Sequence, residues 1–504
     1  MKNNKVLPLV ALISGLLVGC GGGGGGGGGG APAKTELEFN FVKAEQQDIG
    51  TSTASSCKIY DRERTKTSNN GVETTNTKIL IAKPIKDSLN SFLSIVYSDK
   101  NGVVQPDSET YVSNGKVKFY LEDIPDGGYL SIKELFGVNN TYVTSFSKEL
   151  LEAHKNELDD IVLTAVTAVP GLSCTAAGSS NLVEQTKSGI RYLNTKDDTQ
   201  GDSAVLPFFF TSNIEQEQSN DSEITSGTGG TNFQSLSNDI TLVTQYRQAN
   251  SSASLFQYGF DDWASGNIEM SYTGDNQAIL RPSTIPFTDT EIGIVYKETS
   301  KIISTIPNSD NQYFHPSTLR NGEQWFAQTA GVPQTHWTSS FTKPIDDSWN
   351  LNLDESDLFN VSSLSTPEVT LTNNSSGALQ IDLSDNISIQ ESENGIQRIS
   401  ITPNTNLSAI QLHTMYSFVD ETVILPNIAA TDASDLTAFG LQQNYWFSKN
   451  DDDVSVLFVM DGFNSTAATD ESVDSHGAMI TEAERDRIYA QSNTVEHLSL
   501  QRRQ

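Results

Sequence analysis

Short runs in which apolar and polar residues alternate recur along most of this chain, and they constrain its fold more than any other feature. Alternation with a period of two residues, bounded by turn-forming residues, is typical of strands that bury one face. In the first third of the chain, such runs predict strands at Leu37–Val42, Thr77–Ala82, Phe92–Tyr97, Val117–Leu121 and Tyr129–Ile132. We therefore expect a mainly β protein with a few short helices.

A turn between two of these runs predicts a hairpin. Asp99-Lys100-Asn101-Gly102 follows one strand, and Val103-Val104 begins the next. Asn-Gly accepts the positive φ angles of a type I′ turn, which makes it a strong hairpin signal. A calcium loop is the alternative for these four residues, but the acidic ligands that such a loop carries at alternate positions are missing.

The stretch from Val117 to Ile132 combines a strand, a Pro-Gly turn and a second strand that begins with tyrosine. This arrangement resembles a segment of transthyretin-like and CnaB-like sandwiches. The resemblance covers these residues alone. It implies an immunoglobulin-like β-sandwich for residues 36–174, and it implies nothing about activity.

At 504 residues the chain is too long for one ordinary core, so we expect several domains. Residues 175–364 predict a second β-rich domain, with a flexible polar insert at 213–237 that is rich in Ser, Thr, Asn and Gly. Residues 365–462 predict a third β domain. Within these two domains, strands are expected at Leu206–Thr211, Ile240–Tyr246, Ile268–Tyr272, Ile292–Tyr296, Val369–Leu371, Leu379–Leu383, Ile396–Ile401, Tyr416–Leu425 and Val454–Met460.

Two short helices are expected beside the strands. Ser147–Asp160 places several apolar residues near one face of a helix, which should pack on the edge of the first sandwich. The polar tail, 463–504, contains a capping box at Thr481–Glu484 ahead of a helix that ends near Ala490.

The N-terminus has the layout of a secretion signal. A basic start with Lys2 and Lys5 precedes the apolar run Val6–Val18, and Cys20 follows. The apolar run has about 13 residues, fewer than the roughly 20 that a membrane-spanning helix needs. Residues 1–19 are therefore predicted to be a signal peptide that is removed.

The tetrapeptide Leu17-Val18-Gly19-Cys20 resembles the lipobox of bacterial lipoproteins. In that family the cysteine thiol is diacylated, the preceding peptide is removed and the new amino group is usually acylated too. The resemblance implies that Cys20 carries lipid such as palmitate, and two or three acyl chains hold a protein at a membrane durably. An ordinary signal peptide that happens to be followed by a cysteine is the alternative.

The residues after Cys20 indicate where the protein resides and how it is held there. In lipoproteins an aspartate directly after the cysteine often causes retention in the inner membrane, and Gly21 stands there in this chain, which favours the outer membrane. Residues 21–30 are all glycine, so 20–35 predicts a flexible tether. Its glycines would span on the order of 15–20 Å. The sequence leaves open which face of the outer membrane the protein occupies.

Acidic residues outnumber basic ones about two to one, with 63 Asp and Glu against 32 Lys and Arg and a net charge of −31. This charge repels phosphate backbones and anionic headgroups, so nucleic-acid binding is not expected. The acidic residues are scattered along the chain, which is also the pattern of a surface that keeps a protein soluble.

Cys57 and Cys174 are the cysteines that remain after Cys20. An even pair in an exported protein predicts a disulfide, because export leads to an oxidising compartment. Such a bond closes a loop of about 118 residues, and the chain-entropy account sets its stabilisation at up to roughly 4–5 kcal/mol. Two free thiols are the alternative.

Motifs of catalysis and metal binding were sought without success. No Gly-x-Ser-x-Gly elbow is present, and the six histidines show no metal-ligand spacing. Asp451-Asp452-Asp453 could bind calcium, although three acids between strands more often form a solvated turn. We expect no cofactor, no metal and no catalytic residue.

Aromatic residues concentrate in one segment: Trp325, Phe326, His336, Trp337, Phe341 and Trp349. Exposed aromatic rings stack on sugars, so Trp325, Trp337 and Trp349 are candidates for glycan binding. The alternative is that these rings fill a β core, which is the more common role of aromatic side chains. Burial of the rings distinguishes the two.

These observations predict a non-catalytic lipoprotein of the outer membrane, with a structural or protein-binding role at the cell envelope. A lipobox, oligoglycine and an acidic β body together are similar to lipoproteins of the membranous sheath around some polar flagella. A glycan-binding surface lipoprotein is the first alternative. An envelope hydrolase with a site assembled from distant residues is the second.

Overall fold

The chain divides into two compact units, Met1–Thr35 and Glu36–Gln504. For some strands the structure describes the backbone and not the side chains. The structure is a computed structural model, and it describes residues 34–48, 59–69, 72–86, 93–136, 140–153, 155, 162–165, 169–170, 186–194, 205–212, 216–219, 231–236, 240–249, 252–263, 267–273, 277–281, 287–297, 299–306, 312–334, 337–352, 370–382, 396–403, 411–420, 422–428, 452–459, 478–479 and 495–502.

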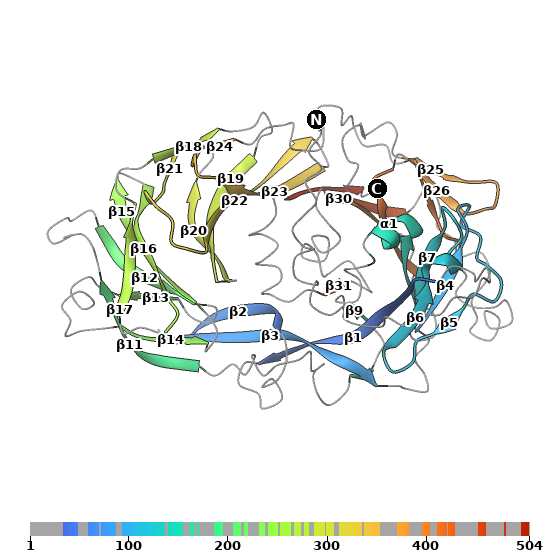
Figure 1. The fold of residues 1–504 in the computed structure, drawn as a ribbon, viewed down its shortest axis with the longest axis horizontal. Helices are drawn as coiled ribbons and strands as arrows, with labels where there is room; N and C mark the ends of the chain where they lie inside the picture. The colour runs from blue at the N-terminus through green and yellow to red at the C-terminus, as the bar shows by residue number, and fades with distance from the viewer. Residues whose placement is uncertain are drawn as a thin grey trace, which may run out of the picture. The chain divides into compact units, whose positions relative to one another are not determined.

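Strands make up most of the described chain (Figure 1), which confirms the expectation of a mainly β protein with few helices. Among the described residues the only α-helix is α1 (Lys148–Ala153), and one 3-10 turn, η3 (Leu121–Asp123), accompanies it. The helix α1 lies at the start of the helix expected at Ser147–Asp160. In the described part of the chain, no helix is both long enough and apolar enough to cross a membrane.

The first sheet has seven strands and is organised around β1, which has three neighbours. This strand pairs antiparallel with β3 and β6 and parallel with β9. The strands of the sheet are β1 (Glu36–Asp48), β2 (Ile59–Asn69), β3 (Val72–Lys86), β6 (Lys116–Tyr120), β9 (Val162–Thr164), β10 (Val169–Pro170) and β31 (Ala478–Met479).

The largest sheet has twelve strands, in the order β20-β19-β22-β23-β32-β30-β27-β28-β8-β7-β4-β5. They are β4 (Leu93–Ser98), β5 (Thr110–Tyr111), β7 (Tyr129–Phe136), β8 (Asn140–Ser147), β19 (Phe287–Tyr296), β20 (Thr299–Ile306), β22 (Glu323–Gln334), β23 (Trp337–Ile345), β27 (Ile396–Pro403), β28 (Gln411–Phe418), β30 (Asp452–Val459) and β32 (Val495–Arg502).

Three smaller sheets complete the described fold. The second seven-stranded sheet has the order β13-β12-β15-β16-β17-β11-β14, and the three-stranded sheets are β21-β18-β24 and β25-β26-β29. Their strands are β11 (Thr186–Asn194), β12 (Val205–Thr211), β13 (Gln216–Ser219), β14 (Thr231–Leu236), β15 (Thr241–Ala249), β16 (Ser252–Asp261), β17 (Asn267–Tyr272), β18 (Gln277–Arg281), β21 (Gln312–Phe314), β24 (Leu351–Asn352), β25 (Thr370–Asn373), β26 (Leu379–Asp382) and β29 (Thr422–Leu425).

The first sheet and the largest sheet pack face to face through a shared core, as a β-sandwich does. Phe39 on β1 and Phe119 on β6 belong to the same buried cluster as Ile132 on β7 and Phe146 on β8. The ring centroids of Phe39 and Phe146 are 5.7 Å apart. Alternating side chains along each strand produce this core, because every second residue points inward. This packing agrees with the expected β-sandwich, whereas the limits 36–174 and the resemblance to transthyretin-like and CnaB-like sandwiches stay predictions.

The middle of the largest sheet is buried on both faces. Tyr416 on β28 joins the sandwich core, whereas its neighbour Met415 belongs to a second cluster with Ile381 on β26 and Leu425 on β29. Buried residues therefore run without a break through Val143–Ser147 on β8. Strands covered on both faces lose the alternation that marks a half-exposed strand.

Strands from distant parts of the chain share this sheet. β8 and β28 pair in parallel, with Thr141 opposite Gln411 and Phe146 opposite Tyr416. β32, from the expected polar tail, lies between β23 and β30. The domain limits expected after residues 174, 364 and 462 stay predictions, but they do not coincide with the limits of a sheet.

The polar insert expected at 213–237 contains two strands, so its description as a loop was wrong for those residues. β13 pairs with β12 and β14 pairs with β11, and the two occupy opposite edges of the second seven-stranded sheet. An edge strand tolerates polar residues, and charged side chains there discourage pairing with other chains. The polar composition is therefore compatible with an edge strand as well as with a loop.

The hairpin expected at Asp99–Gly102 forms, but its turn is not of type I′. Gly102 has a φ of 77°, whereas Asn101 is absent from the described residues with positive φ. Asp99 N donates to Val103 O at 2.9 Å. The loop between these two residues therefore has one residue more than a two-residue hairpin turn. The Oδ1 of Asp99 also accepts hydrogen bonds from the backbone N–H groups of Asn101 and Val103.

A type I′ turn does occur, at Asn114-Gly115. Both residues have positive φ, 53° and 72°. Ser113 and Lys116 exchange two backbone hydrogen bonds of 3.0 Å each, which closes a two-residue hairpin. The turn leads into β6, whose inward residues Val117 and Phe119 enter the sandwich core.

Candidate functional site

The three cysteines of the sequence, Cys20, Cys57 and Cys174, lie outside the described residues. The acylation of Cys20 and the disulfide between Cys57 and Cys174 therefore stay predictions. The helix expected from Thr481 to Ala490 also lies outside the described part of the chain.

Trp325 lies in the core rather than on a surface. Its side chain is 1% exposed, and its ring makes edge-to-face contacts with Tyr258 at 5.7 Å and with Trp349 at 5.2 Å. The neighbouring Phe326 is buried as well, with its ring over Gly293 on β19. The Trp325 ring therefore has no open face on which a sugar could stack.

Trp349 is half-buried and covers the end of that core. Its ring stacks on His315, with centroids 4.3 Å apart and planes 15° from parallel. Its backbone has a φ of 61°, an uncommon conformation for a bulky residue. The N–H of Trp349 donates to Asp346 O, and Tyr313 donates to Trp349 O. Trp337 begins β23, but its side chain lies outside the described part of the structure.

A buried carboxylate holds this aromatic cluster together. Glu323, which is 7% exposed, accepts hydrogen bonds at Oε1 from Tyr258 (2.6 Å) and from the indole of Trp325 (2.7 Å). Its Oε2 accepts the backbone N–H of Arg320 at 3.2 Å. Burial, followed by the charge of Glu323, raises the pKa of Tyr258. Because several donors converge on one carboxylate, Glu323 acts as a structural anchor.

A histidine and two serines form a chain of hydrogen bonds across three strands. Ser145 Oγ on β8 lies 2.8 Å from Nε2 of His413 on β28 and 2.7 Å from Oγ of Ser131 on β7. All three side chains are 0% exposed. These residues point away from the sandwich core, on the face that carries Met415 and the second cluster.

The chemistry of this trio follows from its burial. A serine beside a histidine is the pair that many hydrolases use to generate a nucleophile. Here no substrate can approach the serine, and burial lowers the pKa of His413 to about 3, which keeps the ring neutral. The trio therefore ties β28 to β8 and β7. It was missed in the sequence because Ser145 and His413 are 268 positions apart in the chain.

A buried lysine lies near the β5 edge of the same sheet. The ammonium of Lys133 on β7 pairs with Glu109 at 2.5 Å, and its side chain is 7% exposed. Ser94 on β4 donates to the same Glu109 oxygen at 2.8 Å. The Glu109 side chain is partly exposed. This ion pair satisfies a charge within the sheet rather than forming an open binding site.

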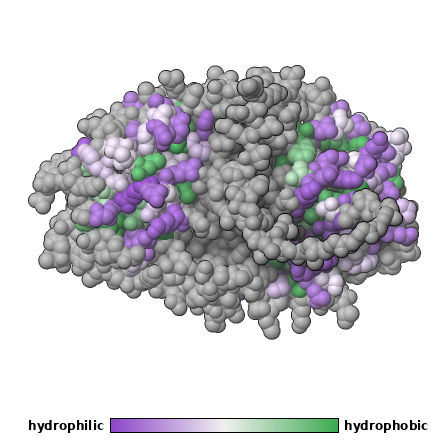
Figure 2. Space-filling view, in the orientation of Figure 1, coloured by the Kyte–Doolittle hydropathy of each residue, from purple (hydrophilic) through white to green (hydrophobic). Residues whose placement is uncertain are grey.

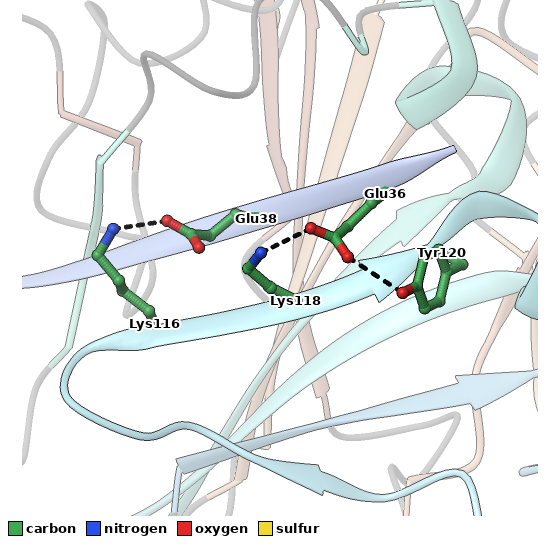
Figure 3. Close-up of polar contacts among 5 residues, drawn as sticks. All are labelled: Glu36, Glu38, Lys116, Lys118 and Tyr120. Atoms are coloured by element: carbon green, nitrogen blue, oxygen red, sulfur yellow. Dashed lines mark hydrogen bonds and ion pairs between the residues drawn. The ribbon is translucent and has the colours of Figure 1, made fainter. Parts of the chain in front are cut away.

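The outer face of the first sheet carries a ladder of charged pairs (Figure 3). Lys116 and Lys118 on β6 bond to Glu38 and Glu36 on β1, each at 2.6 Å, and Tyr120 donates to Glu36 at 3.0 Å. The hydrogen bond from Lys118, followed by that from Tyr120, lowers the pKa of Glu36. The bond to Glu36 in turn raises the pKa of Lys118. These exposed pairs set the register of β1 on β6 more than they add stability.

The described surface mixes hydrophilic and smaller hydrophobic areas on the face that Figure 2 shows. Large apolar side chains that are at least one-third exposed are scattered over different elements in the described chain. They are Val103 (44%), Tyr111 (62%), Ile302 (43%) and Leu319 (36%). Single apolar residues of this kind are normal on a soluble surface.

Among the described residues, no group of three or more His, Cys, Asp or Glu could hold a metal ion. Asp452 and Asp453 begin β30 opposite Pro403 and Thr402. Their side chains and all of Asp451 lie outside the described part. Calcium binding at these aspartates therefore stays an open alternative.

The described residues define a mainly β protein whose sheets stack on shared cores and whose buried polar groups join neighbouring strands. No family model matches this chain, and no curated protein matches it.

Proposed function

We propose that the chain is an outer-membrane lipoprotein, anchored through an acylated Cys20, with a non-catalytic structural or protein-binding role at the cell envelope. The observation that carries this proposal is the order of its N-terminal segments. A signal peptide, the lipobox Leu17–Cys20 and ten successive glycines precede β1, which begins at Glu36. Each segment has a role in an anchored protein and little use in a free one.

The chemistry of the body supports the non-catalytic part of the proposal. The described groups that most resemble catalytic machinery are the Ser131–Ser145–His413 trio and Glu323. Both are buried between or beside strands and bond to other parts of the same fold. Their arrangement favours rigidity of the sheets, which suits a protein that presents surfaces to partners.

The similarity to flagellar-sheath lipoproteins suggests the first place to look for the protein. Lipobox, oligoglycine and net acidity together carry that similarity. In a sheathed bacterium, the prediction is enrichment of the protein in purified sheath relative to the remaining outer membrane. Immunoblotting of the two fractions measures it, and equal abundance in both would assign the protein to the envelope in general.

Replacing the anchor residue tests the proposal directly. Cys20→Ser removes the thiol that receives lipid, so the variant should lose incorporated palmitate and leave the outer-membrane fraction. Intact-mass measurement and metabolic labelling of both proteins in the native host provide the readout. A wild-type chain that is soluble and carries no lipid would contradict the proposal.

Gly21→Asp is the matched control, because it changes the sorting signal and leaves the thiol in place. By the similarity to lipoproteins, the variant should remain acylated but shift toward the inner membrane. Density-gradient separation of the two membranes measures this. If both variants lose lipid equally, the effect lies in export or folding and not in acylation at Cys20.

A further inference from the structure

The strand β32 joins two blocks of the largest sheet. β32 pairs antiparallel with β23 on one side and with β30 on the other, over six residue pairs each. On one side of it lie β20, β19, β22 and β23, and on the other lie β30 and the six strands that follow it in the sheet. The last described residue, Arg502, lies opposite Val454 on β30. Without β32, the described strands of the two blocks share no pairing in this sheet.

Two unpaired strand edges would face each other if β32 were withdrawn. Backbone N–H and C=O groups on such edges form hydrogen bonds with any added strand that fits, which is the basis of strand addition between chains. The slot between β23 and β30 is matched in register to one sequence, Val495–Arg502. Every copy of the chain carries one such strand and one such slot.

The connection to β32 is far longer than the pairing requires. Antiparallel neighbours such as β30 and β32 can be joined by a hairpin of two to five residues. Here residues 460–494 separate them, and β31 within that connection pairs with β9 in the first sheet. The 15 residues from 480 to 494 still follow β31. Extended, they reach at most roughly 50 Å.

We propose that β32 exchanges between copies of this chain, so that β32 of one copy fills the β23–β30 slot of another. A long connection and a slot matched in register to the strand are features that make exchange inexpensive, because both forms contain the same pairings. Reciprocal exchange closes a dimer, and successive exchange builds a chain of copies. The inference goes beyond the proposed function and does not depend on acylation.

Pairs of engineered cysteines distinguish exchange from closure within one chain. Thr338 and Ser499 lie opposite each other in the β23–β32 register, and both are close to cysteine in size. Opposite residues of paired strands are near enough for a disulfide. Full-length chains carrying Thr338→Cys and Ser499→Cys, with different tags, are produced together in one cell, purified in detergent and oxidised. The unsubstituted chain measures background from the native cysteines.

A mismatched pair provides the control for chance collision. Thr342 is opposite Val495, four residues along the strand from the position that faces Ser499. Its Cα is about 13 Å farther along, beyond disulfide reach. Exchange predicts several-fold more disulfide-linked heterodimer from Thr338→Cys with Ser499→Cys than from Thr342→Cys with Ser499→Cys. The excess should grow with the amount of protein produced.

A double variant, Thr338→Cys with Ser499→Cys in one chain, reports pairing of β32 with β23 within a single chain. If the double variant closes its disulfide within single chains while the mixed single variants give only the mismatched background, exchange does not occur. If neither arrangement forms the bond, the slot does not hold β32 and the proposal is also overturned. Loss of lipid in a parallel Cys20→Ser experiment would leave all of these results unchanged.

Discussion

At Gly128 a single missing side chain permits a turn between the two sheets of the sandwich. A β-carbon there would lie 2.3 Å from Ser98 O and 2.8 Å from Pro125 O. Both are backbone atoms, and Gly128 itself bonds to Pro125 O and to Lys148 N. Gly128→Ala should therefore force the turn to shift and lower the free energy of unfolding by about 1–3 kcal/mol. Urea unfolding measures the change.

Gly322→Ala is the control, because it adds the same methyl group without a steric contact. Gly322 has a φ of 81°, and an added β-carbon would meet nothing within 4 Å. Only the left-handed backbone conformation opposes alanine, at a cost of about 1–2 kcal/mol. If Gly128→Ala leaves both the free energy of unfolding and the m-value unchanged, the close approach of Ser98 O to residue 128 is wrong.

The burial of His413 makes stability depend on pH. The folded pKa of about 3 lies below the unfolded value near 6.5, so between these values the unfolded chain binds more protons. Stability is then complete above pH 6.5 and declines as the pH falls toward 3, by up to about 1.4 kcal/mol per pH unit. His413→Gln removes the titration and can still bond to Ser145. Unfolding of both proteins at pH 7.5 and pH 4.5 measures the difference.

Acidic side chains also titrate over part of the range between pH 3 and pH 6.5. The effect of His413 is therefore measured as the difference between wild type and His413→Gln. The difference in unfolding free energy between wild type and His413→Gln should shift in favour of the variant as the pH falls. An unchanged difference at the two pH values would mean that His413 is accessible to protons in the folded protein.

At the scale of the elements, the two Asn-Gly turns require different backbone conformations of their asparagines. Asn114 adopts a φ of 53°, whereas Asn101 is not among the described residues with positive φ. Asn114→Ala should therefore destabilise the β6 hairpin by roughly 1 kcal/mol, because asparagine tolerates the left-handed region better than alanine. Asn101→Ala should stay within about 0.5 kcal/mol of wild type. Thermal unfolding of both variants tests this, and equal shifts would contradict the turn assignment.

Local pattern was enough to predict most strands, because alternation and turn residues act within a few positions. Leu37–Val42 lies in β1, Thr77–Ala82 in β3, and Ile396–Ile401 in β27. The kind of turn was less predictable. Asn-Gly was assigned a type I′ turn at 101–102 but forms one at 114–115, since the extra residue in the first hairpin changes which position needs positive φ.

The candidate residues were harder to assign than the strands, since their roles depend on partners far along the chain. Ser145 and His413 appear polar in sequence and would suit an exposed face, yet each is buried by pairing between β8 and β28. Trp325 could have been a sugar platform or a core residue, and burial beside Tyr258 places its ring in the core. Hydrophobic pattern specifies a strand but not its neighbour.

For the whole molecule, we expect the fold of the β body to be independent of the predicted glycine tether. The body unit begins at Glu36, after the end of the glycines at Gly30. Deleting residues 21–30 should leave the midpoint of thermal unfolding unchanged while shortening reach by on the order of 15–20 Å. Calorimetry of the purified proteins measures the first effect. A shift of several degrees would show that the glycines belong to the fold.

The organisation of the sheets explains why domain limits are difficult to read from this sequence. Composition and strand spacing change near residues 174, 364 and 462, but β8, β28 and β32 bring these regions into one sheet. Parallel pairing such as that of β8 with β28 requires a crossover and leaves no local signature. A hairpin can be read from adjacent residues, whereas this connection depends on the rest of the chain.

The parallel pairing of β8 with β28 also has a consequence for how the protein is made. During synthesis, Ser145 cannot form its hydrogen bond with His413 until 268 further residues have been added to the chain. At synthesis rates of 5–20 residues per second, that interval is on the order of 15–50 s. Until then the exposed edge of β8 can pair with other nascent chains, and folding is slow because the contact is remote in sequence. An exported copy would need to be shielded by a chaperone until its final third has arrived.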